Sequence, residues 1–126
     1  MEHAKKILIV EDEAPMRRAL VDSFTEEKFQ VVEAGDGVEG LKKALEEYPD
    51  LILLDVVMPR MDGPSMLKEL RKDKWGRGVP VIFLTNLNDA EKIVEATAGG
   101  AAGYLVKFNW KLEDVVKKVK DRLKLT

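Results

Sequence analysis

The sequence predicts an α/β domain with a doubly wound parallel sheet of five strands and five helices. Two observations carry this prediction. Short apolar segments that suit buried strands alternate with longer segments whose apolar residues recur every three or four positions, as on one face of a helix. The alternation runs through the chain five times. Strands separated by helices pair in parallel and are joined by right-handed crossovers, so that helices cover both faces of the sheet.

The five expected strands are short and mostly apolar. The first, residues 6–10, and the third, residues 51–54, contain continuous apolar runs of the kind found in strands buried on both faces. Residues 29–32 form a short second strand, residues 79–84 a fourth and residues 103–106 a fifth. The first and third strands run directly into carboxylate side chains.

The first two helices are expected after the first and second strands. Pro15 suits the first turn of a helix, where the missing amide hydrogen has no partner to lose. The apolar residues of this helix recur every four positions: Met16, Leu20 and Phe24. Asp36 and Glu39 have the spacing of a capping box at the start of the second helix. We expect the buried stripe of that helix to contain four residues: Val38, Leu41, Leu45 and Tyr48.

The other three helices follow the third, fourth and fifth strands. Gly63 and Pro64 begin the third helix. The inward residues of this helix are Met66, Leu67 and Leu70. Asn88 caps the fourth helix, which the glycine pair at 99–100 ends. Asn109 is expected to cap the last helix. The apolar face of the last helix has five residues: Leu112, Val115, Val116, Val119 and Leu123.

Length and composition limit the classes of function. The 126 residues are enough for one domain, and with no linker or repeat we expect a single domain over residues 1–126 without an output domain. The chain has no cysteine, which excludes disulfides and thiolate metal sites and fits a cytoplasmic protein. The net charge of -2 lacks the basic excess of nucleic-acid binders. No apolar run approaches the roughly 20 residues that cross a membrane.

Polar side chains follow the predicted strands where those strands end. The carboxyl ends of parallel strands share one edge of a sheet, so Asp12, Asp55, Thr85 and Lys107 are expected to converge there. Taken singly, each residue has a simpler interpretation: acids cap helices, lysines are often only solvated, and threonine favours strands. A packing explanation does not require all four to lie at carboxyl ends, so their convergence favours a functional site.

The acidic residues at this edge point to a cation. Glu11, Asp12 and Asp55 place three carboxylates in a small space, where they repel one another unless a cation neutralises them. Their ligand atoms are all oxygen, which suits Mg²⁺ and also Mn²⁺. The only histidine is His3, so a catalytic histidine pair is not expected. A carboxylate beside such an ion can attack phosphorus and form an aspartyl phosphate.

Four segments, in order, resemble the receiver domain of two-component response regulators. They are EDE at 11–13, LLDVVMPRMDG at 53–63, VIFLT at 81–85 and GYLVK at 103–107. The resemblance covers essentially the whole chain. It implies a flavodoxin-like (CheY-like) fold with strand order 2-1-3-4-5 and a phosphorylation-controlled role in phosphorelay signal transduction.

The resemblance implies a role for each residue of the motifs. Asp55 would be the phospho-acceptor, taking a phosphoryl group from a histidine kinase or a histidine phosphotransfer protein. Glu11 and Asp12, with Asp55 and the backbone carbonyl of Val57, would hold Mg²⁺. Thr85 and Lys107 would bind the phosphoryl oxygens. Tyr104 would be the aromatic residue that moves inward on activation.

The resemblance also implies how the protein signals. The fourth helix, fifth strand and fifth helix, roughly residues 89–123, would form the surface that changes on phosphorylation and binds a downstream protein. The protein would catalyse only its own phosphorylation and dephosphorylation, as a monomer or a phosphorylation-dependent dimer. No direct contact with nucleic acid or membrane is implied.

The chain departs from the family pattern at a few positions. Phe108 stands where the family usually has a proline with a cis bond, and a cis bond to a non-proline residue costs about 3 to 4 kcal/mol, so we predict a trans peptide after Lys107. Asn86 is larger than the usual residue after the threonine. Val57 and Leu87 occupy positions that tune hydrolysis, and neither can bind an attacking water, which predicts slow dephosphorylation.

Two other classes of function remain as alternatives. One is a receiver-like docking domain that is not phosphorylated, which Phe108 and Asn86 keep open. The other is an enzyme on the same fold. A phosphohydrolase of the familiar pattern has a second aspartate where this chain has Val57, and a flavin binder needs a phosphate-binding loop where residues 11–15 are acidic and would repel phosphate.

Overall fold

A computed structural model describes residues 4–85, 103–106 and 111–125 of the chain. Strands and helices alternate as predicted up to residue 85, and a helix again follows the last strand. The elements are β1 (Lys6–Val10), α1 (Ala14–Glu26), β2 (Gln30–Ala34), α2 (Gly37–Glu47), β3 (Leu51–Asp55), α3 (Gly63–Leu70), β4 (Val81–Thr85), β5 (Gly103–Val106) and α5 (Leu112–Arg122). The predicted fourth helix, from Asn88 to the glycine pair at 99–100, lies outside the described residues.

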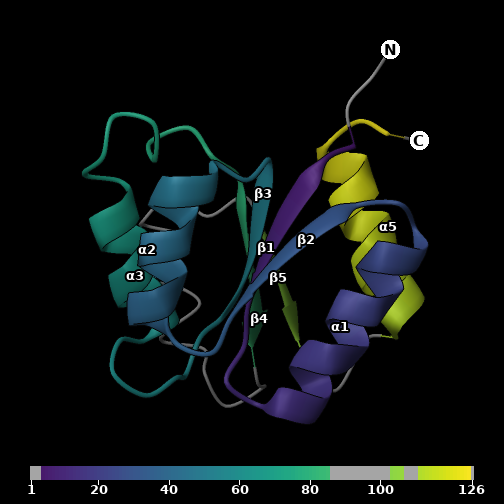
Figure 1. Cartoon of the computed structure of the whole chain (residues 1–126), viewed down its shortest axis with the longest axis horizontal. Coiled ribbons are helices and arrows are strands. Elements are labelled where there is room, and N and C mark those ends of the chain that lie inside the picture. The colour runs from purple at the N-terminus through teal and green to yellow at the C-terminus, as the bar shows by residue number, and fades with distance from the viewer. Residues whose placement is uncertain (1–3, 86–102, 107–110, 126) are drawn as a thin grey trace.

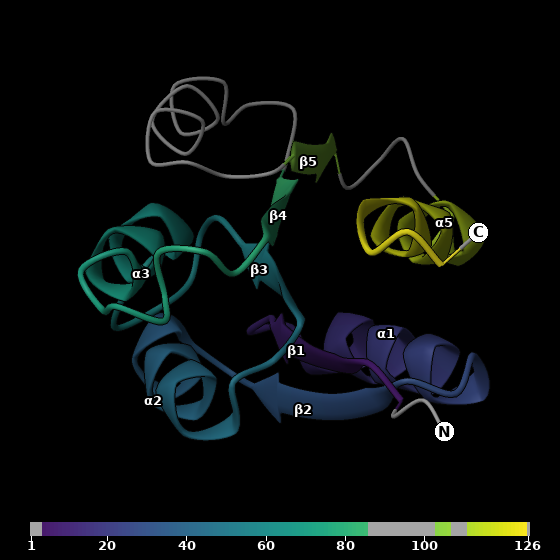
Figure 2. The same cartoon turned by 90° about the horizontal axis from the view of Figure 1, so that it is seen from above.

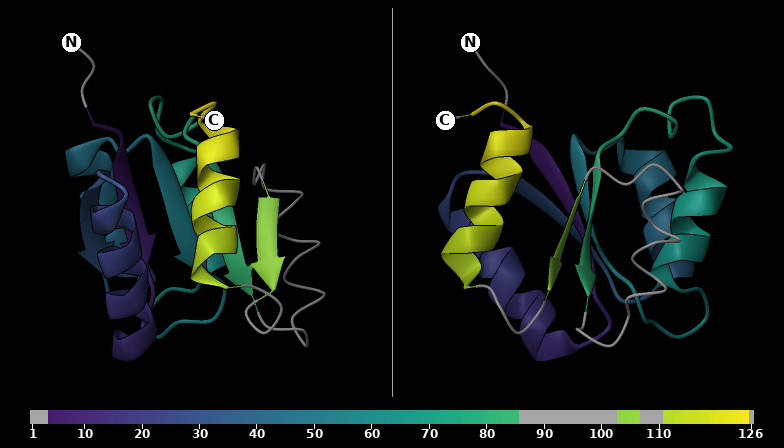
Figure 3. Two further views of the ribbon diagram at one scale, coloured as in Figure 1. Left: turned by 90° about the vertical axis from the view of Figure 1, so that its right-hand side faces the viewer. Right: turned by 180° about the vertical axis from the view of Figure 1, so that it is seen from behind.

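The five strands form one parallel sheet in the order β2-β1-β3-β4-β5, which confirms the predicted fold and strand order. Helices α2 and α3 cover one face, and α1 and α5 cover the other (Figures 1 and 2). The arrowheads of the strands all point to the same edge (Figure 3). The chain reverses its direction of winding between β1 and β3, which is where open α/β sheets form a crevice for ligands.

The central strands are buried on both faces. Side chains alternate along a strand, so Leu8 and Val10 of β1 join the core under α2 and α3, whereas Ile7 and Ile9 join the core under α1 and α5. Strand β3 divides its four leucine and isoleucine residues in the same way, and all four are fully buried. The continuous apolar runs therefore have the double burial that the sequence predicts.

Two strand boundaries differ from the prediction. Strand β2 is Gln30–Ala34 rather than 29–32, because Phe29 belongs to the turn after α1, where its ring packs edge-on against Phe24 with ring centroids 5.3 Å apart. Strand β4 begins at Val81 rather than at residue 79. Proline lacks the amide hydrogen that strand pairing needs. Pro80 therefore contributes only its carbonyl, which accepts a hydrogen bond from the Ile52 amide of β3 at 3.0 Å.

The buried stripe predicted for α2 is wrong at both ends. Val38 is 37% exposed and Tyr48 is 59% exposed. The buried positions of this helix are instead small, among them Gly40 and Ala44. A Cβ atom at Gly40 would lie 2.9 Å from both methyl groups of Val10, so the helix approaches β1 too closely for a large side chain on that side.

The starts of α2 and α3 are fixed by aspartate caps. The Asp36 carboxylate accepts a hydrogen bond from the Glu39 amide at 2.9 Å, which confirms the predicted cap of α2. The Glu39 carboxylate pairs with Lys43 at 2.9 Å. Asp62 caps α3 and accepts from the Ser65 amide at 2.8 Å.

The last helix begins later than its predicted cap. Its N-cap is Lys111 rather than Asn109, which itself lies outside the described residues. The Lys111 amide donates to the Asp114 carboxylate at 2.9 Å, so an acid inside the first turn provides the capping hydrogen bond. The predicted apolar face is confirmed by three fully or nearly buried valines: Val115, Val116 and Val119. In the described part of the chain, no helix has the length and apolar character needed to cross a membrane.

Candidate functional site

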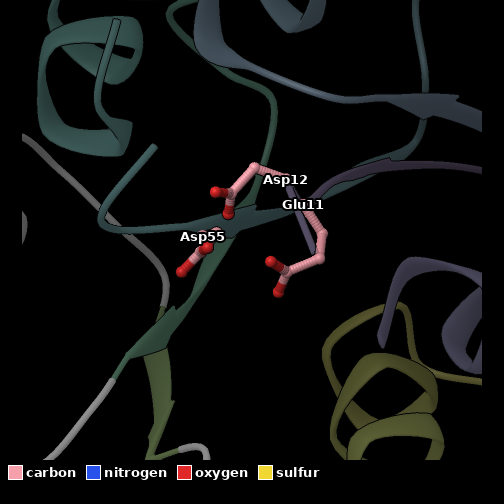
Figure 4. A group of neighbouring side chains, drawn as sticks. All are labelled: Glu11, Asp12 and Asp55. Carbon is pink, nitrogen blue, oxygen red and sulfur yellow. The ribbon is translucent and has the colours of Figure 1, made fainter. Parts of the chain in front are cut away.

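Three carboxylates meet at the carboxyl edge of the sheet. Glu11 and Asp12 directly follow β1, and Asp55 is the last residue of β3. The two strands are neighbours, with Val10 opposite Leu54, so acids that are distant in sequence are brought side by side. One oxygen atom from each of the three carboxylates lies within 4.8 Å of the others. Figure 4 shows the three side chains directed into the same space.

The three acids differ in their exposure to solvent. Glu11 is fully buried and Asp55 is 4% exposed, whereas Asp12 is exposed. Buried carboxylates are stable only when they are hydrogen-bonded, paired or bound to a metal ion. The donor set consists of carboxylate oxygens, which is the chemistry that Mg²⁺ and Mn²⁺ prefer. The residues present therefore fit a hard divalent cation, reached from the side of Asp12.

The loop that carries Glu11 and Asp12 is held from within. Glu11 accepts a hydrogen bond from the Glu13 amide at 3.1 Å. The guanidinium of Arg17 donates to the Glu11 carbonyl at 2.8 Å and pairs with Glu33 on β2 at 3.0 Å. The N-cap of α1 is Glu13, and the Glu11 carboxylate binds its amide, so Glu11 supports the start of this helix as well as belonging to the acidic cluster.

The loop after Asp55 turns back onto the strand that it leaves. The Val56 amide donates to the Leu84 carbonyl at 3.1 Å, and the Val56 carbonyl accepts from the Gly63 amide at 2.8 Å. A Cβ atom at Gly63 would lie 2.3 Å from the Asp55 carbonyl oxygen, so only glycine fits this return. Val57 lies in the loop and is 53% exposed.

The backbones of two further predicted site residues are in place. Thr85 ends β4, one residue beyond Leu84, which lies opposite Asp55. Tyr104 lies in β5, opposite Phe83. The side chains of Thr85 and Tyr104 lie outside the described part of the structure.

Other predicted positions lie wholly outside the described residues. Lys107 follows β5 directly, and Asn86 follows β4. Leu87 and Phe108 lie in the same two segments, so the trans peptide after Lys107 stays a prediction. The same holds for the part of the proposed signalling surface that lies before β5.

Arg17 supports the site through the Glu11 carbonyl, a role that was not predicted from the sequence. Arg17 lies one turn into α1. The helical period predicts which apolar residues face the core, but it does not predict which polar residue contacts the preceding loop. The sequence predicts Asp36 as a helix cap but not its ion pair with Arg60, because the two residues meet at 3.1 Å across 24 positions of sequence.

Comparison with known proteins agrees with this architecture. The model of the response regulator receiver domain family matches residues 7–120. A probable transcriptional regulator, ycf27, of Guillardia theta is 39% identical over 107 residues, which are 85% of this chain and 41% of the relative. The chain therefore spans about two fifths of the length of this curated relative.

Solved structures resemble the fold over nearly its whole length. The chemotaxis protein CheY4 of Vibrio cholerae has a TM-score of 0.87 at 32% identity, covering 94% of this chain and 98% of CheY4. The receiver domain of the sensor histidine kinase PA1611 of Pseudomonas aeruginosa PAO1 has a TM-score of 0.83 at 27% identity, covering 94% and 97%. That receiver was solved with a magnesium ion coordinated in its active site cleft.

Proposed function

Because this chain belongs to the response regulator receiver domain family, we propose that Asp55 is its phospho-acceptor and takes a phosphoryl group from a histidine kinase or a histidine phosphotransfer protein. The observation that carries the proposal is the placement of Asp55. It ends a fully buried central strand, is only 4% exposed, and lies within 4.8 Å of two other carboxylates at the sheet edge.

The proposed cofactor is Mg²⁺, with Mn²⁺ as a substitute. Glu11, Asp12 and Asp55 would hold the ion, together with the backbone carbonyl of Val57. When bound, the ion neutralises the carboxylates and the oxygens of the incoming phosphoryl group. The magnesium ion in the PA1611 receiver supports this choice, as does the all-oxygen donor set of this chain.

The transfer needs little covalent chemistry from the protein. A carboxylate oxygen of Asp55 forms a bond to phosphorus while the phosphorus–nitrogen bond of the donor phosphohistidine breaks and its electron pair stays on the imidazole. Phosphoryl transfer depends on positioning and on neutralising charge. Thr85 and Lys107 are proposed to contact the phosphoryl oxygens, and Tyr104 is proposed to move inward once they do.

The output of this reaction is proposed to be a change of binding surface. Residues 89–123 would present it to a downstream protein, with the chain acting as a monomer or as a dimer that forms on phosphorylation. The protein would catalyse its own phosphorylation and dephosphorylation and no other turnover. The proposal includes a cytoplasmic location, as the family resemblance implies.

The direct test is phosphorylation by acetyl phosphate in the presence of Mg²⁺, followed by intact mass spectrometry. Wild type should gain the mass of one phosphoryl group, and Asp55→Asn, which keeps the shape of the side chain, should not. Asp22→Asn removes an exposed acid from α1 and should behave as wild type. Equal behaviour of wild type and Asp55→Asn would overturn the proposal and favour the docking-domain alternative.

A further inference from the structure

The loop between β3 and α3, residues 56–62, is tied to the start of α2 by an ion pair. The Arg60 guanidinium lies 3.1 Å from the carboxylate of Asp36. The side chain of Asp36 is 13% exposed and that of Arg60 is 61% exposed. Asp36 also caps α2 through its other oxygen, so the two carboxylate oxygens have separate partners.

The backbones beside this ion pair are in close contact. A Cβ atom added at Gly37 would lie 2.2 Å from the Met61 carbonyl oxygen. Gly37 follows Asp36 and Met61 follows Arg60, so the ion pair and the backbone contact form one continuous junction. The loop and the start of α2 are therefore joined at two adjacent points.

The backbone of Arg60 is unfavourable for its residue type. Its φ is 68°, in the left-handed region that glycine adopts readily and other residues rarely adopt. Glycine would suit this backbone better than arginine does. Residues held in such conformations tend to lie at functional sites, and Arg60 lies in the loop that follows Asp55.

The ion pair is a charged one at neutral pH. The hydrogen bond from the Glu39 amide, and to a smaller extent the attraction of Arg60, hold the pKa of Asp36 below its ordinary value in spite of the opposing effect of burial. Hydrogen bonds and opposite charges favour the ionised carboxylate.

The loop held by this junction is the one that leaves Asp55. It starts one residue after Asp55 and closes beneath it, where Gly63 packs against the Asp55 carbonyl oxygen. Val57, whose carbonyl is the proposed fourth ligand of Mg²⁺, lies between the closed base of the loop and Arg60. Val57 and Arg60 therefore lie in the same short loop, whose base is closed by the hydrogen bond from the Gly63 amide to the Val56 carbonyl.

We propose that Asp36 and Arg60 form a latch that holds the β3–α3 loop in the conformation that binds Mg²⁺, with both acting as positioning residues. This inference rests on the proposed function of the Asp55 site. Arg60, with its left-handed backbone, would thereby raise the affinity for the cation, and the start of α2 would help to support the site.

Arg60→Gly removes the charge of the latch and at the same time relieves the left-handed backbone of the turn. We expect Arg60→Gly to keep or raise Tm yet to bind Mg²⁺ about two- to fivefold more weakly at low ionic strength, the range for an exposed ion pair. Arg60→Lys should recover most of the affinity. The difference should shrink at high salt, which screens exposed charges. Amide NMR chemical shifts measured along a Mg²⁺ titration give each affinity.

A second variant tests the partner residue. Asp36→Asn keeps an oxygen that can cap α2 and removes the charge, so it should weaken Mg²⁺ binding by the same factor as Arg60→Gly. The double variant should be no weaker than either single one, because both break the same contact. Lys72→Gln breaks an exposed ion pair with Glu69 and should leave the Mg²⁺ affinity unchanged.

The possible outcomes distinguish a failure of the latch from a failure of the proposed function of the Asp55 site. If wild type binds Mg²⁺ and Arg60→Gly binds it equally well, or if the two losses add in the double variant, the latch is overturned and the proposed function stands. If wild type shows no Mg²⁺-dependent shifts at residues near Asp55, the proposed metal site and the latch are both overturned.

Discussion

Asp12 is the exposed member of the acidic cluster, and it has the least to gain from the fold. Glu11 accepts a hydrogen bond from the backbone, and Asp55 lies at the end of a buried strand, but Asp12 faces solvent beside both. Like charges this close destabilise the folded state when no cation is bound. Residues of this kind are retained where function requires them, at a cost to stability.

Asp12→Asn should therefore stabilise the protein that lacks metal. We expect its Tm without Mg²⁺ to rise by roughly 2 to 4 °C at low ionic strength, since the repulsion between Asp12 and its two neighbouring carboxylates is removed. Excess Mg²⁺ should raise the Tm of wild type, because a ligand that binds only the folded state stabilises it, and should hardly change that of Asp12→Asn. Thermal unfolding followed by circular dichroism measures both effects.

Asp22→Asn is the control for a general effect of charge. It should respond to Mg²⁺ as wild type does. A Tm of Asp12→Asn that falls in the absence of metal, or that rises with Mg²⁺ as much as wild type, would argue against a cation held between these carboxylates.

Helix α2 is positioned by small residues, and this determines how closely its N-terminus approaches the site. Gly40 faces Val10 and Met66, whose side-chain atoms lie within 3.0 Å of the place that a Cβ atom would occupy. Ala44 is fully buried one turn later. Because the helix lies so close to β1, its cap at Asp36 can reach the loop that follows β3.

Gly40→Leu should separate α2 from the sheet. Overpacking of a core position costs about 1 to 3 kcal/mol, and we expect a loss of unfolding free energy in that range. Urea denaturation measures it. Gly78→Ala is a matched control, because nothing lies within 4 Å of a Cβ atom at that position, and it should be neutral. A leucine at position 40 without cost would mean that α2 is packed less tightly than described.

The strands of this fold were easier to predict from the sequence than the contact face of α2. The strands β1 and β3 were predicted well because strands buried on both faces need apolar residues at every position, whatever packs against them. The contact face of α2 was not, because a close helix–sheet contact selects small residues that carry no hydrophobic signal. Val38 and Tyr48 are apolar and correctly spaced, yet they lie outside that contact.

The acidic half of the candidate site was predictable from the topology. Parallel strands bring their carboxyl ends to one edge, so the convergence of Glu11, Asp12 and Asp55 follows from the fold class alone. The junction of Asp36 with Arg60 was not predictable, because it depends on a turn conformation and on the docking of α2. Thr85 and Lys107 remain predictions as site residues.

In the molecule as a whole, the acidic edge of the sheet is supported by contacts from α1 and from the start of α2. The sheet fixes the three acids, Arg17 fixes the first loop, and the start of α2 is joined to the second. The site is thus arranged for a chemical reaction, but the proposed result of that reaction is a changed binding surface on the protein itself. This edge is proposed to direct a phosphoryl group to one aspartate, Asp55.

Reductive trapping identifies the residue that accepts the phosphoryl group. Borohydride reduces an aspartyl phosphate to homoserine, so the acceptor is identified by peptide mass spectrometry after treatment with acetyl phosphate and Mg²⁺. We predict homoserine at position 55 alone, dependent on Mg²⁺ and absent when the metal is chelated. Homoserine at position 12 or at another aspartate would show that Asp55 is not the sole acceptor, and trapping at position 55 that is unchanged by chelation would show that the transfer does not need Mg²⁺.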